Sequence, residues 1–161
     1  MGTVFTLPEA LSARKTRNLH TLVFTNGHFD LLHVGHLDYL ERARSLGDAL
    51  FVGVNGDSAS QALKGSGRPF VPAAERARLV AALCCVDAAI IFEDLTASAL
   101  ITTLKPEIYV KGGDYGDKPL PERPTVEAYG GRIELIDLLA GHSTTALIAR
   151  IRAESHAAHD S

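Results

Sequence analysis

Apolar residues follow two alternating patterns along the chain. Short runs that are apolar or β-branched predict buried strands, and they lie at residues 21–25, 49–54, 87–92, 107–110 and 132–136. The segments between them carry helical spacing, as Leu37, Leu40 and Ala43 do, and predict helices at 9–17, 35–46, 72–83, 96–104, 122–129 and 143–152. Strands without polar alternation are typical of a parallel sheet covered by helices. We therefore predict an α/β fold, a Rossmann-like parallel sheet of five strands with helices on both faces.

Length and composition limit the classes to which the chain can belong. Its 161 residues, 46% hydrophobic and 22% charged, suit one globular domain. We expect an N-terminal helical extension at 1–19, the domain itself at 20–153 and a flexible tail at 154–161. A net charge of −3 argues against a broad nucleic-acid surface, and no apolar run reaches the roughly 20 residues that span a bilayer.

The cysteines bear on the cellular compartment. Cys84 and Cys85 are adjacent, so they cannot close a stabilising loop, and a reducing compartment is the simplest interpretation. The N-terminus shows no apolar leader followed by a small-residue cleavage site. We therefore expect a cytoplasmic protein without membrane or nucleic-acid partners.

The segment 26–36 (NGHFDLLHVGH) carries the strongest chemical signal, because it follows the first strand of the predicted domain. Ligands of parallel sheets bind at such carboxyl ends. His33 and His36 lie three residues apart at a helix start, so both face one side, and Gly35 leaves the backbone between them open. Two imidazoles beside free helix N–H groups suit a phosphate. Two alternatives remain: structural histidines at a turn, and a zinc site with His28, which lacks a Cys or carboxylate at matching spacing.

Three further segments carry groups that suit phosphates. The loop 64–69 (KGSGRP) places two cations among glycines, and Ser143, Thr144 and Thr145 can cap a helix start. Lys111 ends a strand, so its ammonium group can enter the same cleft. Each segment also has a plain structural interpretation, as a solvated loop, a helix cap or an ordinary strand end.

These motifs together resemble a known family. The segment 27–36 (GHFDLLHVGH) is similar to the G-x-F-D-x-x-H-x-G-H signature of the cytidylyltransferase-like nucleotidyltransferases. The segments 110–115 (VKGGDY), 64–69 and 143–148 (STTALI), with Glu75-Arg76 and Gly130-Gly131, resemble the branch that makes ADP-heptose. The resemblance covers about 20–153 and implies a Rossmann-like enzyme. It would move AMP from ATP to a sugar 1-phosphate, D-glycero-D-manno-heptose 1-phosphate, and release pyrophosphate.

The resemblance also implies roles for individual residues. Catalytic roles fall to His33, His36, Lys64 and Lys111. Nucleotide contacts fall to Asn26, Gly27, His28, Phe29, Asp30, Gly35, Arg68, Arg76, Gly112, His142, Ser143, Thr144 and Thr145. Contacts to the acceptor fall to Asn55, Asp57, Gly113, Asp114 and Tyr115. Mg²⁺ would be held mainly by the phosphates, without dedicated protein ligands, and the protein would form a homodimer.

Some positions depart from the family pattern, and alternatives stay open. The branch often has Cys where His28 and His142 stand and Ser where Gly56 stands, and the segment 116–124 is rich in proline. A cytidylyltransferase that uses CTP and glycerol or polyol phosphate, or an FMN adenylyltransferase, would share the mechanism. A non-catalytic nucleotide-binding module would share only the fold. A dinucleotide-dependent oxidoreductase is disfavoured, because no G-x-G-x-x-G follows the first predicted strand.

Overall fold

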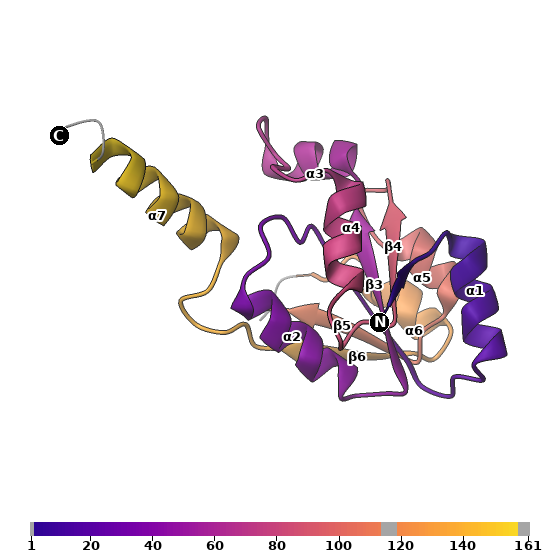
Figure 1. The fold of residues 1–161 in the computed structure, drawn as a ribbon. Coiled ribbons are helices and arrows are strands. Elements are labelled where there is room, and N and C mark those ends of the chain that lie inside the picture. Colours follow the sequence, from indigo (N-terminus) through magenta and orange to yellow (C-terminus); the bar gives the residue numbers. More distant parts are fainter. Residues whose placement is uncertain (1, 114–118, 158–161) are drawn as a thin grey trace.

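The fold is a parallel sheet between two layers of helices, seen in a computed structural model that describes residues 2–113 and 119–157 (Figure 1). The strands are β1 (Thr3–Val4), β2 (Leu22–Gly27), β3 (Ala49–Asn55), β4 (Ala88–Phe92), β5 (Ile108–Gly112) and β6 (Arg132–Ile136). The helices are α1 (Leu7–Thr16), α2 (Val34–Arg44), α3 (Asp57–Lys64), α4 (Ala73–Ala81), α5 (Ser98–Leu104), α6 (Arg123–Ala128) and α7 (Thr144–Ala157). The predicted fold class is confirmed.

The strand order places one reversal of winding at the centre of the sheet. The order is β1-β4-β3-β2-β5-β6, and every pair is parallel. The chain winds outward from β2 through β3 to β4, and it then crosses back to β5 on the other side of β2. A crevice opens where neighbouring strands lead their helices to opposite sides. That point is the carboxyl end of β2 and β5, where Thr25 pairs with Val110.

Both faces of the sheet are buried, which explains the unbroken apolar strands. Val23 and Val52 face a core with Leu40 of α2 and Val80 of α4. Their sequence neighbours face the opposite core, which α1, α5 and α6 cover; its members include Leu22, Phe24, Phe51, Ile101, Leu104, Tyr109 and Val126. Most residues of the central strands β2, β3 and β5 are therefore apolar whichever way they point, whereas the edge strand β6 is partly exposed and includes Arg132 and Glu134.

The prediction of five strands was wrong, because the sheet has six. The additional strand is β1, which pairs with the edge of β4 through Thr3 and Ala88. The N–H of Phe5 then donates to the carbonyl of Ala89 at 2.9 Å. A two-residue strand is too short to show a period, so the pattern could not indicate it. Ala10 of α1 is fully buried, so the segment predicted as an extension contributes both a strand and a core side chain.

The last helix differs from the rest. α7 projects away from the body of the molecule, at the far left of Figure 1. It continues past the predicted end at 152 into the segment expected to be a flexible tail, and residues 158–161 lie outside the described part. In the described part of the chain, every helix is too short or too polar to cross a membrane.

Candidate active site

The central crevice begins with a hydrogen-bonded group at the ends of β2 and β5. The hydroxyl of Tyr109 donates to Oδ1 of Asn26 at 2.7 Å, and Nζ of Lys111 lies 3.3 Å from the same oxygen. Burial lowers the pKa of Lys111, and the nearby charge of Glu122 partly opposes this effect. These bonds hold the ammonium group of Lys111 at the mouth of the crevice.

The two motif histidines stand at the start of α2. The rings of His33 and His36 are stacked with their centroids 3.9 Å apart. The backbone N–H of His33 donates to Nδ1 of His36 at 3.3 Å, so a neutral His36 carries its proton on Nε2. Burial, with a smaller contribution from His33, lowers the pKa of His36 to about 4. Burial also lowers the pKa of His33. His36 is therefore a neutral hydrogen-bond donor near pH 7.

His28 lies in a field of cations. Its Nδ1 is 2.9 Å from Oγ of Ser60, which comes from α3. Burial, with smaller contributions from the charges of Lys64 and Arg76, lowers the pKa of His28 to about 4. The same positive field that disfavours a protonated imidazole attracts an anion.

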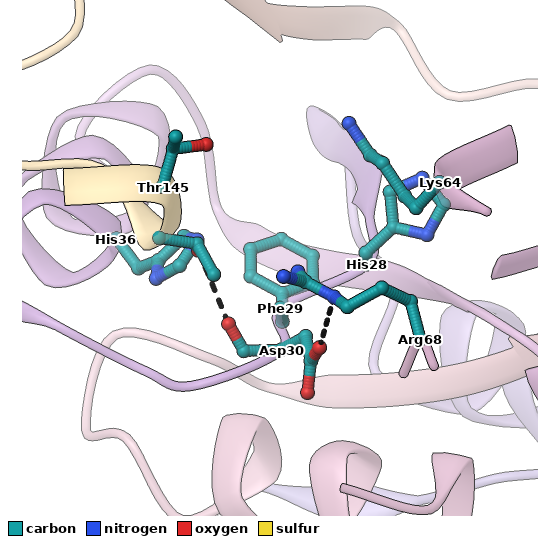
Figure 2. Close-up of a pocket in the computed structure, with 8 residues that line it drawn as sticks. His28, Phe29, Asp30, His36, Lys64, Arg68 and Thr145 are labelled. Atoms are coloured by element: carbon teal, nitrogen blue, oxygen red, sulfur yellow. Dashed lines mark hydrogen bonds and ion pairs between the residues drawn. The ribbon is translucent and has the colours of Figure 1, made fainter. Parts of the chain in front are cut away.

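Asp30 ties the glycine-containing loop to the histidine segment. Its carboxylate is almost fully buried and pairs with Nε of Arg68 at 2.9 Å. It also accepts hydrogen bonds from the N–H groups of Phe70 and Val71. Thr144, at the start of α7, donates to the backbone carbonyl of Asp30 at 3.2 Å (Figure 2). One residue thus fixes three segments that are far apart in the sequence.

The segment between β2 and α2 has an unusual backbone. Phe29 and Leu31 have φ angles of 49° and 55°, which place both in the left-handed region. Bulky residues rarely occupy this region, and they do so where the surroundings hold them there. The hydrogen bonds to Asp30 supply that restraint, and strained backbone of this kind is typical of functional sites.

Arg76 and Asp57, which were predicted as a nucleotide contact and an acceptor contact, pair with each other in the structure. The Arg76 side chain is fully buried, and its Nη1 donates to the carbonyl of His28 at 2.5 Å. Its Nη2 pairs with Oδ1 of Asp57 at 2.8 Å, and that oxygen also accepts from the N–H of Ala73. Buried guanidinium groups need such partners, and here the partners are protein atoms. Arg76 therefore links the segment after β2 to Asp57, whose side chain is still 53% exposed.

Three adjoining cavities form the site. The histidine pocket, of about 300 Å³, is lined by His28, Phe29, Asp30, His36, Lys64, Arg68, Thr144 and Thr145. The strand-end pocket, of about 450 Å³, is lined by Asn26, Gly27, His28, Asn55, Leu63, Lys64, Leu95, Thr96, Lys111, Pro121 and Glu122. The helix-start pocket, of about 250 Å³, is lined by His33, Gly35, His36, Tyr39, Lys64, Leu138, His142, Ser143, Thr144 and Thr145.

Lys64 lines all three cavities and His28 lines two, so these residues stand where the cavities meet. Figure 2 shows His36 and Thr145 on one side of the histidine pocket, with His28, Lys64 and Arg68 on the other. Thr145 belongs to the start of α7, where Oγ of Ser143 accepts a hydrogen bond from the N–H of Ala146 at 3.1 Å. The predicted helix cap is therefore present, beside free N–H groups that suit a phosphate.

Most residues predicted for the site come together in these cavities, and a few do not. Gly112 and Gly113 line none of the three. A Cβ atom at Gly112 would lie 2.8 Å from Leu138, so this glycine permits a close approach. Asp114 and Tyr115 lie outside the described residues. Gly35 does line a pocket, and a Cβ atom there would lie 3.0 Å from the Cβ of His142.

Several residues of the strand-end pocket were not predicted from the sequence. Leu95, Thr96, Pro121 and Glu122 come from loops that could not be placed without the fold. Thr96 follows β4, and the tendency of ligands to bind at carboxyl ends of strands pointed to that loop. Glu122 had no such signal, because a glutamate in a proline-rich segment is ordinarily exposed.

Comparisons with known proteins agree with this geometry. The family described as cytidylyltransferase-like matches residues 24–148. The bifunctional protein HldE of Syntrophotalea carbinolica is 50% identical over 145 residues, which cover 90% of this chain and 29% of that protein. The bifunctional protein HldE of Geotalea uraniireducens is 50% identical over 149 residues, covering 92% of this chain and 30% of that protein.

The chain therefore spans about three-tenths of the length of these relatives. Among solved structures, the lipopolysaccharide core biosynthesis protein from Thermoplasma volcanium is similar, with a TM-score of 0.59 and 28% identity. The match covers 74% of this chain and 96% of that one.

Proposed function

This chain belongs to the cytidylyltransferase-like family, and on that premise we propose that it is an adenylyltransferase acting on a sugar 1-phosphate. It would move AMP from ATP to D-glycero-D-manno-heptose 1-phosphate and release pyrophosphate. The observation that carries the proposal is the neutral donor His36 in a pocket shared with the cations Lys64 and Arg68. The segments 64–69, 110–115 and 143–148, which resemble the ADP-heptose branch, favour this acceptor.

The chemistry would be a direct in-line displacement. A phosphate oxygen of the acceptor attacks the α-phosphorus of ATP, and the bond to the pyrophosphate oxygen breaks. The attacking oxygen is already an anion near pH 7, so the step needs no general base. Catalysis then depends on positioning and on neutralising the charge that gathers on the phosphates. His36 would donate from Nε2, and Lys64 would supply positive charge at the reacting phosphorus.

The arrangement of the cavities suits two substrates. The histidine pocket and the helix-start pocket share the N-terminus of α7 and would hold the triphosphate and its nucleoside. The strand-end pocket contains Lys111 and would hold the acceptor phosphate. Because His28 and Lys64 belong to both sides, the two substrates would meet there.

Magnesium enters this proposal as the companion of ATP. Asp30 is the carboxylate of the histidine pocket, and it already binds Arg68 and two backbone N–H groups. Mg²⁺ commonly keeps several waters and binds through the phosphates of its substrate. These residues therefore fit an ion that arrives with the triphosphate and neutralises its charge.

Pyrophosphate release is the direct test. ATP, CTP, GTP and UTP would each be paired with both anomers of the heptose 1-phosphate, with glycerol 3-phosphate and with FMN. We expect release with ATP and one heptose anomer. A preference for CTP with glycerol 3-phosphate would show that the proposed substrates are wrong, while the in-line mechanism would still apply. Tight ATP binding without release from any pair would instead support a binding module. The expected homodimer would be tested on the same sample by sedimentation.

A further inference from the structure

We propose that Glu122 recognises a hydroxyl group of the acceptor, and that the strand-end pocket thereby selects a phosphorylated sugar over other phosphates. The assignment of the pocket to the acceptor rests on the proposed function. The role of Glu122 rests on its own surroundings, which can be tested by binding alone.

Among the described residues, only one of the two carboxylate oxygens of Glu122 has a hydrogen-bond partner. Glu122 directly precedes α6, and only 3% of the residue is exposed. Its Oε1 accepts a hydrogen bond from the N–H of Ala97 at 3.3 Å. Its Oε2 is buried and has no hydrogen-bond partner among residues 2–113 and 119–157. A buried carboxylate oxygen without a donor is costly, and buried polar atoms of this kind normally have partners. On this proposal, a ligand bound in the strand-end pocket, which Glu122 lines, supplies the missing donor as it binds.

A cation in the strand-end pocket indicates what else that ligand carries. Lys111 lines the same pocket, and its ammonium group is held by Asn26 rather than by the carboxylate. Within the described chain, no ion pair joins Lys111 to Glu122. The pocket thus offers a cation and, apart from it, an anionic acceptor. A phosphate suits the first and is repelled by the second, whereas a hydroxyl group suits the second.

The remaining walls and the size of the pocket fit a sugar phosphate. The volume of about 450 Å³ lies within the usual range of roughly 300–1,000 Å³ for small-molecule sites. Leu63, Leu95 and Pro121 supply apolar surface for the carbon skeleton of a sugar. Asn55 and Thr96 add neutral polar groups. A few fixed polar groups on apolar walls are typical of specific small-molecule sites.

The alternative is that Glu122 only anchors α5 through Ala97. That role uses Oε1 alone and leaves the buried Oε2 without a donor among the described residues. Glu122→Gln separates the two roles, because glutamine keeps one carbonyl oxygen for Ala97 and replaces the other oxygen with an amide donor. Glu127→Gln is the matched control, since Glu127 lies on α6 with its side chain 59% exposed.

Calorimetric titration of the full chain tests the proposal. The probes are heptose 1-phosphate, mannose 1-phosphate, inorganic phosphate and ATP. We expect the wild type to bind at least one sugar 1-phosphate more tightly than inorganic phosphate. Glu122→Gln should lower the affinity for that sugar phosphate about ten- to hundredfold, which is the range for losing a hydrogen bond to a charged group. It should not weaken the binding of inorganic phosphate, which the carboxylate repels, and it should leave the affinity for ATP within twofold. Glu127→Gln should change none of the four affinities.

A deoxy series identifies the hydroxyl group. The monodeoxy sugar 1-phosphate that lacks it should bind the wild type as weakly as the parent binds Glu122→Gln. In Glu122→Gln the same deletion should cost no further affinity, because the two changes remove one interaction.

Several results would overturn the role of Glu122. They are an equal loss for sugar phosphate and inorganic phosphate, an unchanged affinity for the sugar phosphate, or no preference for sugar phosphates in the wild type. Binding that depends on Glu122 without pyrophosphate release would refute the proposed reaction and keep the hydroxyl contact. Heptose-dependent release of pyrophosphate that is insensitive to Glu122→Gln would refute the hydroxyl contact and keep the proposed reaction. Thermal melting of each variant checks that it is folded.

Discussion

At the scale of single residues, the site depends on which atom of an imidazole carries the proton. The backbone N–H of His33 donates a hydrogen bond to Nδ1 of His36, and burial lowers the pKa of His36 to about 4. The ring is therefore neutral near pH 7, with its one N–H at Nε2. Such a donor is oriented before the substrate arrives, so no reorganisation is needed during the reaction.

Removing that donor should cost turnover rather than stability. His36→Ala is expected to lower kcat about 100- to 1,000-fold, the usual effect of losing one oriented donor to a developing charge. Steady-state pyrophosphate release with saturating ATP and acceptor measures it. His20→Ala is the control, because His20 is exposed and contacts Asn18 rather than any of the three pockets. Near wild-type turnover in His36→Ala would show that this imidazole does not contact the reacting phosphates.

The lowered pKa values of His28 and His36 also set a pH dependence of stability. In the unfolded chain a histidine binds its proton near pH 6.5, whereas these two bind theirs near pH 4 in the folded protein. Between these values the unfolded state holds more protons, so the free energy of unfolding falls as the pH falls.

We expect Tm to decrease from pH 7.5 to 5.5, and less steeply in His28→Asn. Asparagine keeps a polar partner for Ser60 and has no proton to gain. Parallel melting curves of the two proteins measure the difference. Identical slopes would mean that His28 titrates normally in the folded state.

At the scale of elements, the site is assembled by braces that link loops to helices. Arg76 of α4 connects the carbonyl of His28, the carbonyl of Val71 and the carboxylate of Asp57. It therefore fixes the end of β2, the glycine-containing loop and the start of α3 relative to one another. The sequence placed Arg76 beside the family motifs but could not show whether its side chain faced the ligand or the core.

Arg76→Met should destabilise the fold by about 2–5 kcal/mol, because it leaves two carbonyl groups and a carboxylate without their donor. Urea unfolding followed by circular dichroism measures the change. Arg78→Met is the matched control, since Arg78 is exposed on the same helix and should change stability by less than about 0.5 kcal/mol. Equal effects of the two substitutions would rule out the brace.

Elements with a long apolar pattern were predictable, and short or polar ones were not. The strand predicted at 49–54 matches β3 closely, because every residue of β3 is buried. The strand predicted at 132–136 matches β6, although this edge strand is partly exposed and carries Arg132 and Glu134. α3 was not predicted, since it has eight residues and buries only Ala59 and Ser60. The spacing of His33 and His36 likewise predicted that their rings face one side of the helix start, and the rings are stacked in the structure. The place of Glu122 in the strand-end pocket depends on contacts between distant segments, which local sequence patterns do not contain.

At the scale of the whole molecule, the last helix contributes to the ligand walls but not to the hydrophobic cores. The residues of both core clusters end at Ile136. α7 projects from the body and carries no fully buried residue in its described part, yet Thr144 and Thr145 line the site.

A chain ending at residue 142 should therefore still fold but bind ATP more weakly. We expect cooperative melting with a Tm within a few degrees of the full chain, because no core residue is removed. ATP affinity should fall at least tenfold with the loss of the α7 N-terminus. Circular dichroism and calorimetry measure the two properties. A non-cooperative melt would show that α7 supports the cores after all.

Lys64 stands in the walls of all three cavities, and this has a consequence for how the substrates influence one another. A phosphate that reaches its ammonium group first neutralises a charge that the second substrate would also have used. On the proposed function, each ligand would then lower the affinity of the other, and thermodynamics requires the two penalties to be equal. A shared cation that aligned the reactants would thus also make them antagonists in the ground state, and this antagonism would favour departure of the products.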